Sequence, residues 1–188
     1  CLMPLLLGWH WFDPAARRNA RGIDAYSQGR FGEALQRFLS ARGLRPEDAA
    51  LQHNTAAAMY KLGKFKEALE EFSRVEPGRH SVSRRDFHYN LGNTYYRMEQ
   101  YDKALDHYKQ ALLRDPGDED TKRNFELALR KLQQQRRKSR DPKQSRKDGS
   151  RNKPQSQKDS PSPRGAEGGK QRPEKKYQSM LQYLSQKE

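Results

Sequence analysis

The chain has 188 residues, of which 32% are hydrophobic and 33% charged, so a single thick core over the whole length is excluded. The formal net charge is +14, and residues 136–176 alone hold 15 Lys and Arg against 5 Asp and Glu. The single cysteine, Cys1, excludes an intrachain disulfide and a cysteine-rich metal site, and the five histidines show no metal-ligand spacing.

Residues 1–14 contain the most apolar stretch of the chain, which is too short to span a bilayer. The start at Cys rather than Met predicts a processed chain or a fragment. The stretch is typical of the end of a membrane helix or signal segment, with Trp9 and Trp11 at the membrane interface. Alternatively, Cys1 carries a lipid, or the segment folds onto the first helix. Membrane association through the N-terminus is the favoured expectation.

A ten-residue pattern recurs along the chain, starting at Gly29, Gly63 and Glu99. The spacing is therefore 34 residues and then 36, which is the sign of a helical repeat. A tyrosine stands three residues before each start: Tyr26, Tyr60 and Tyr96. The pattern predicts a hairpin of two helices in each repeat, at about 15–28 and 31–43, 48–61 and 64–75, 84–98 and 101–113.

Small residues at equivalent positions are expected to let the two helices of each hairpin approach closely: Gly22, Ala56, Gly92, Ala34, Ala68 and Ala104. Aromatic residues are expected to fill the space between neighbouring hairpins: Phe31, Phe65, Tyr101, Phe38, Phe72 and Tyr108. Gly29 and Gly63 predict a left-handed residue at the end of the first helix, a place that Glu99 takes in the third repeat.

Residues 118–135 predict a capping helix with Asp118 as its N-cap and with Phe125, Leu129 and Leu132 on its inner face. Residues 136–176 lack aromatic residues and an apolar period, and therefore predict a disordered basic linker. Residues 177–188 predict a short amphipathic helix. It is either a frayed apolar end or an element that binds another protein or the groove of this one.

The third repeat carries the signature residues of a known repeat at the expected spacing: Leu91, Gly92, Tyr95, Ala104, Tyr108 and Pro116. The chain thus resembles the tetratricopeptide-repeat family. The resemblance implies an all-α fold, a right-handed superhelix of three helical hairpins plus a C-terminal capping helix, followed by a disordered tail. The predicted repeat domain is residues 15–135, with repeats at about 15–48, 49–84 and 85–118.

In such a stack the first helix of each repeat lines a concave groove. The predicted partner-binding residues are Asn19, His53, Asn54, Tyr60, Lys61, Tyr89, Asn90, Asn93, Tyr96, Arg97 and Asn124. Other inward positions are Ile23, Ala57, Arg123 and Leu127. Asn54, Asn90 and Asn124 share one repeat position. Their amides can bond either the backbone of a bound peptide or a neighbouring helix, and both interpretations stay open.

No catalytic motif is present, so neither an enzyme nor a cofactor is predicted. The basic linker lacks the interleaved aromatic residues that stack on nucleic-acid bases, which disfavours nucleic acid. It is a spacer, or it contacts a membrane surface or an acidic protein. The carboxylate clamp of chaperone-binding family members requires a Lys and an Asn where this chain has Asn19 and Ile23, and a Lys and an Arg where it has Asp86 and Asn90. Binding of chaperone carboxy termini is therefore disfavoured.

Residues 11–17, 89–97 and 115–129 resemble a branch of the family, the tetratricopeptide proteins of bacterial Bat (aerotolerance-type) operons. This resemblance implies anchoring in a bacterial inner membrane, a periplasmic repeat domain, and assembly with von Willebrand factor A-type and AAA-type ATPase proteins. The main hypothesis is a membrane-tethered, non-enzymatic scaffold that binds a partner segment in its groove. The alternative is a cytosolic adaptor whose basic tail contacts nucleic acid or an acidic protein.

Overall fold

The computed structural model describes residues 13–75, 82–140 and 173–185. The expectations for residues 1–12, including a lipid on Cys1 and membrane association, and for most of the basic linker lie outside the described residues. Within the described ranges the chain forms eight α-helices and no strand, which confirms the all-α class.

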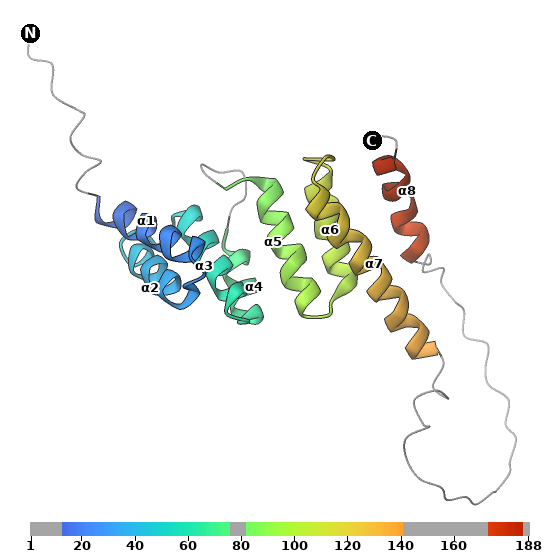
Figure 1. Cartoon of the computed structure of the whole chain (residues 1–188), viewed down its shortest axis with the longest axis horizontal. Helices are drawn as coiled ribbons and strands as arrows, with labels where there is room; N and C mark the ends of the chain where they lie inside the picture. The colour runs from blue at the N-terminus through green and yellow to red at the C-terminus, as the bar shows by residue number, and fades with distance from the viewer. Residues whose placement is uncertain (1–12, 76–81, 141–172, 186–188) are drawn as a thin grey trace, which may run out of the picture. The chain divides into compact units, whose positions relative to one another are not determined.

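Six helices form the repeat region: α1 (Pro14–Ser27), α2 (Phe31–Arg42), α3 (Ala49–Lys61), α4 (Phe65–Ser73), α5 (Arg84–Arg97) and α6 (Tyr101–Leu112). They pack as three hairpins, α1 with α2, α3 with α4 and α5 with α6 (Figure 1). Each hairpin also packs on the next, because α2 contacts α3 and α4 contacts α5. The first helices of neighbouring repeats, α1 with α3 and α3 with α5, are in contact as well.

Two helices follow the hairpins, α7 (Glu119–Arg140) and α8 (Pro173–Ser185). The contacts within the chain divide it into one compact unit that ends at Ala128 and a second that begins at Leu129, so the boundary falls inside α7. The first unit contains the three hairpins and the start of α7. α7 continues past its predicted end at residue 135, because the Gln and Arg residues that follow are good helix formers.

The second unit contains the rest of α7 and α8. Tyr177, Met180 and Leu184 are buried on α8, at the spacing of one helix face. The amphipathic pattern that predicts a helix here thus corresponds to a helix with one covered side.

Side-chain caps fix the beginnings of several helices. Asp13 accepts a hydrogen bond from the Ala15 backbone amide at 3.0 Å, and Asp48 accepts one from the Ala50 amide at 2.9 Å. Asp118 accepts bonds at the start of α7, as predicted, including one of 2.7 Å from the Thr121 hydroxyl.

The turns inside the hairpins have the predicted left-handed residue. Gly29 and Gly63 have φ angles of 75° and 76°, and Glu99 has the equivalent conformation with a φ of 59°. This conformation strains a residue that has a Cβ atom, so the third repeat forms its turn at a cost that the first two avoid.

Close packing of the helices depends on the predicted small residues. Ala34, Ala68 and Ala104 are completely buried at equivalent places. A Cβ atom on Gly92 would lie 2.5 Å from the ring of Tyr108, and one on Gly22 would meet the ring of Phe38 at the same distance. Tyr108 and Phe38 therefore pack against the first helix of their own hairpins. Phe38 also shares a buried cluster with Ala58 of the next hairpin, as the expectation for the aromatic residues has it.

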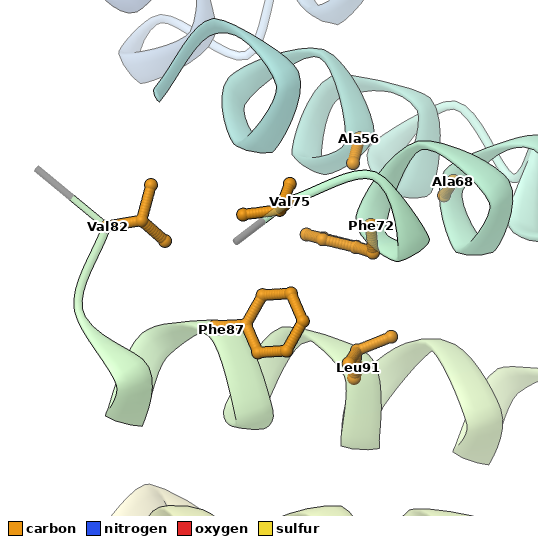
Figure 2. Packing of buried hydrophobic residues seen from close by; sticks show 7 residues of the cluster. All are labelled: Ala56, Ala68, Phe72, Val75, Val82, Phe87 and Leu91. Carbon is orange, nitrogen blue, oxygen red and sulfur yellow. The ribbon is translucent and has the colours of Figure 1, made fainter. Parts of the chain in front are cut away.

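The second and third hairpins share a buried apolar cluster, drawn in Figure 2: Ala56, Ala68, Phe72, Val75, Val82, Phe87 and Leu91. In that view Phe87 and Leu91 extend from α5 toward Phe72. The rings of Phe72 and Phe87 meet edge to face, with centroids 6.3 Å apart. Phe72 thus lies between neighbouring hairpins, as predicted.

Candidate partner-binding groove

A hollow of about 430 Å³ opens in the first unit, on the side where α1, α3, α5 and the start of α7 lie. We call it the groove. Its lining residues are Tyr26, Ala57, Tyr60, Lys61, Phe72, Tyr89, Asn90, Asn93, Tyr96, Arg97, Tyr108, Asn124 and Leu127. Most of them come from the first helix of a repeat, while Phe72 and Tyr108 reach the floor from α4 and α6.

Eight of the eleven predicted binding residues line this groove: Tyr60, Lys61, Tyr89, Asn90, Asn93, Tyr96, Arg97 and Asn124. Asn19, His53 and Asn54 are not among the lining residues. Ala57 and Leu127 lie in the groove, in agreement with their inward repeat positions. That any of these residues contacts a partner stays a prediction.

Tyr26, Phe72 and Tyr108 line the groove although the repeat pattern predicts no binding role for them. Phe72 and Tyr108 are core residues that also border the hollow. Ala57 borders the hollow as well, and it stands at the repeat position that Ile23 occupies in α1, Asn93 in α5 and Leu127 in α7.

A row of aromatic pairs runs along the first helices. Each tyrosine before a turn meets the aromatic residue that begins the next helix. The ring centroids are 5.2 Å apart for Tyr26 and Phe31, 5.6 Å for Tyr60 and Phe65, and 5.4 Å for Tyr96 and Tyr101. Because the same pair forms in each repeat, the three tyrosine rings are held at the same position in their repeats.

Each of the first two pairs receives a cation from the following repeat. The Lys61 ammonium lies 5.7 Å from the centre of the Phe31 ring, and the Arg97 guanidinium lies 4.9 Å from the centre of the Phe65 ring. Such cation–π contacts hold the charged ends in a defined position while leaving them exposed to solvent.

The side chains of the three asparagines at the shared repeat position form hydrogen bonds with the first helix of the preceding repeat. The Asn54 amide donates to the Asn19 side-chain oxygen at 3.0 Å, and the Asn124 amide donates to the Asn93 side-chain oxygen at 3.0 Å. The Asn90 amide nitrogen lies 3.0 Å from Nε2 of His53. In the structure these amides therefore bond neighbouring helices, which is one of the two interpretations left open by the sequence.

Neutral hydroxyl groups supply much of the polar character of the groove. Burial raises the pKa of Tyr26 and of Tyr60, although Arg97 acts on Tyr60 in the opposite direction. Burial also raises the pKa of Tyr108, whose hydroxyl donates to the Asn93 side-chain oxygen at 2.8 Å. These phenols stay protonated at neutral pH and can donate hydrogen bonds.

The formal charge on the groove lining is positive. Lys61 and Arg97 are its charged residues, and no Asp or Glu is among the lining residues. Across the described ranges no group of three or more His, Cys, Asp or Glu side chains could hold a metal ion. The groove offers aromatic faces, hydroxyl donors and two cations, a combination suited to binding a peptide segment.

Comparison with known proteins identifies the fold family. A tetratricopeptide-repeat model matches residues 19–81, and a second model of this repeat matches residues 86–118. Together they cover about half of the chain. The chain therefore belongs to the tetratricopeptide-repeat family, as its sequence predicts.

Several curated relatives are Hsp70–Hsp90 organizing proteins. Protein 1 of Glycine max is 30% identical over 112 residues, which are 58% of this chain and 19% of that protein. Protein 3 of Arabidopsis thaliana is 28% identical over 116 residues, with 58% and 20% covered. The chain thus spans about a fifth of the length of the curated relatives it matches.

Solved structures support the fold. The first tetratricopeptide-repeat domain of Spaghetti (RPAP3), solved with the HSP90 peptide SRMEEVD bound, is 18% identical in sequence and has a TM-score of 0.57. The match covers 63% of this chain and 93% of the Spaghetti chain. The Sgt2 domain of Aspergillus fumigatus is also 18% identical, with a TM-score of 0.58 and coverage of 82% and 91%. These likenesses establish the helical architecture.

The family and its relatives point to a protein-interaction module rather than a catalytic domain. They do not support the closer resemblance to Bat-operon proteins, since the relatives found are co-chaperone organizing proteins. Among the helices of the described ranges, none combines the length and the apolar character needed to cross a bilayer.

Proposed function

We propose that this protein is a non-enzymatic scaffold that binds an extended segment of a partner protein in the groove. The observation that carries the proposal is the hollow of about 430 Å³ between the first helices, with tyrosine rings and two exposed cations in its lining. Ordered rings lose little conformational freedom on binding, so they contribute contact area at small entropic cost.

Site-specific photo-crosslinking tests this function. A benzophenone amino acid in place of Leu127 puts the reactive group in the groove, while the same group in place of Gln36 puts it on the exposed side of α2. The expected result is that a partner is captured from Leu127 and not from Gln36, and that Tyr60→Ala with Tyr96→Ala abolishes capture. Equal capture from both positions would refute groove binding.

A chaperone tail is a second candidate ligand. It is favoured by the relatives, which are Hsp70–Hsp90 organizing proteins, and by the domain bound to an HSP90 peptide. The clamp positions oppose it. Ile23 is apolar, Asp86 is acidic, and Asn90 is engaged with His53. We therefore propose a ligand other than a chaperone carboxy terminus, and calorimetry with free SRMEEVD peptide provides the test: tight binding would favour the chaperone tail.

The cellular setting remains a prediction. The Bat-type resemblance implies an inner-membrane anchor, a periplasmic domain, and von Willebrand factor A-type and AAA-type ATPase partners. A cytoplasmic adaptor with a nucleic-acid or acidic partner for its basic tail is the alternative. Fractionation of cells that produce the full-length protein separates these settings, because recovery in the soluble cytoplasmic fraction would exclude the anchored one.

A further inference from the structure

The two groove cations have surroundings that differ from those of the arginines that form ion pairs. Several arginines of the hairpins have carboxylate partners, such as Arg42 with Glu71 and Arg85 with Asp118 at 3.2 Å. Within the described residues, neither Lys61 nor Arg97 forms an ion pair. Their positive ends rest against aromatic rings, and no carboxylate in the described part of the chain pairs with them.

Lys61 and Arg97 stand at the same position in successive repeats. Each follows the last tyrosine of its helix, Tyr60 before Lys61 and Tyr96 before Arg97, so the charges are repeated from one helix to the next along the same side of the groove. An extended ligand that runs along the groove would meet a cation at each of two successive repeats. The hydroxyl of Tyr60 interacts with Arg97.

The chain itself supplies a poor occupant. Residues 136–176 carry ten more positive than negative charges and would be repelled by Lys61 and Arg97. A ligand with carboxylates instead gains charge-assisted hydrogen bonds with both cations.

We propose that the groove selects an extended acidic segment and recognises its side-chain carboxylates at Lys61 and Arg97, without requiring a free carboxy terminus. This inference rests on the groove binding proposed above and names the chemistry of the partner. Carboxylate side chains at two places along the segment meet the two cations, and apolar side chains between them contact Ala57 and the tyrosine rings.

Selection from a random twelve-residue peptide library, displayed as internal segments without free carboxy termini, tests the inference on the full chain. The expected result is enrichment of peptides rich in Asp and Glu. Amidated copies of them should bind the double variant Lys61→Glu with Arg97→Glu at least about tenfold more weakly, as loss of charged hydrogen bonds predicts. The matched control, Lys64→Glu with Lys66→Glu, changes exposed lysines outside the groove and should keep the affinity.

The outcomes separate the two proposals. Enrichment of peptides without acidic residues would overturn the acidic-segment inference and leave groove binding in place. Failure to enrich any peptide would count against both. Binding of a single-stranded RNA dodecamer that is lost in the Lys61→Glu, Arg97→Glu variant would assign the cations to nucleic acid and would also overturn the inference.

Discussion

Two glycines beneath aromatic rings set the distance between the helices of their hairpins. A Cβ atom on Gly92 would lie 2.5 Å from the Tyr108 ring, which is almost fully buried and anchored through its hydroxyl to Asn93. Burial and the hydroxyl bond hold the ring in place, so packing requires glycine at this position. A Cβ atom on Gly32 of α2 would meet no other atom within 4 Å, so packing places no such requirement on that glycine.

Gly92 and Gly32 should respond in opposite directions to alanine. Gly92→Ala is expected to lower the free energy of unfolding by about 1–3 kcal/mol, because overpacking outweighs the gain in helix propensity. Gly32→Ala is the control and should raise it by roughly 0.5–1 kcal/mol through propensity alone. Urea unfolding followed by circular dichroism measures both. Equal changes in the two variants would show that the contact with Tyr108 is unimportant.

Glu99 is the one residue other than glycine with a positive φ in the described ranges. The first two repeats have Gly29 and Gly63 at the same place. Glu99→Gly should therefore stabilise the protein by about 1 kcal/mol, because it removes the clash of a Cβ atom in the left-handed conformation. Thermal unfolding checks this prediction, and a lower melting temperature would contradict it.

A histidine pair makes stability depend on pH. Nδ1 of His88 lies 3.1 Å from Nδ1 of His107, so one ring donates and the other accepts. Burial first, and then the charges of His107, Arg114 and Arg84, lower the pKa of His88 from 6.5 to about 4. Burial lowers the pKa of His107 as well.

The direction of the pH effect follows from these pKa values. Between pH 6.5 and about 4 the unfolded chain binds a proton at His88 that the folded chain does not, so stability is lost as the pH falls through this window. His88→Gln should show a smaller loss than the natural protein when unfolding is measured at about pH 7, 5.5 and 4. An identical loss would exclude the pair as its source.

At the scale of helices, the hairpins are joined by polar links as well as by apolar packing. The Glu71 side chain of α4 is 8% exposed and pairs both with Arg42 of α2 and with Arg74, the latter at 2.6 Å. On the other side, side-chain amides connect successive first helices, as between Asn54 and Asn19. The first two hairpins are thus fixed to each other on two faces.

Removal of the buried carboxylate should loosen the first two hairpins. Glu71→Ala is expected to cost about 1–3 kcal/mol, because Arg42 is left partly buried without a partner. Its neighbour Glu70 is exposed, so Glu70→Ala should change stability by less than about 0.5 kcal/mol. Urea unfolding compares the two, and equal effects would indicate that the ion pairs contribute nothing.

The helices were largely predictable from the repeat, since periodic apolar positions mark each of them and capping residues such as Asp13, Asp48 and Asp118 mark where several begin. The groove was predictable only in part. Repeat position tells which side of a helix a residue occupies, and so it placed Tyr60 and Asn90 correctly beside the hollow. It does not tell which side chains of other helices lie nearby. The bond between Asn90 and His53 and the place of Tyr108 in the groove lining could therefore not be predicted from it.

At the scale of the whole chain, charge and fold are separated. The hairpins bury their apolar residues by stacking, while ten of the fourteen net positive charges belong to residues 136–176. The basic segment and the groove cations both attract acidic partners. Increased salt should therefore weaken partner binding whether the groove alone or also the basic segment contacts the partner, because exposed charges are screened.

Whether a partner segment lies in the groove can be decided by NMR of the full chain with ¹³C-labelled tyrosine rings. The titrant is the partner segment captured by crosslinking from Leu127. Groove binding predicts that the ring signals of Tyr26, Tyr60, Tyr89 and Tyr96 shift as the segment is added, while that of Tyr183 on α8 does not. Saturable binding that leaves these four groove signals unchanged would show that the segment binds elsewhere.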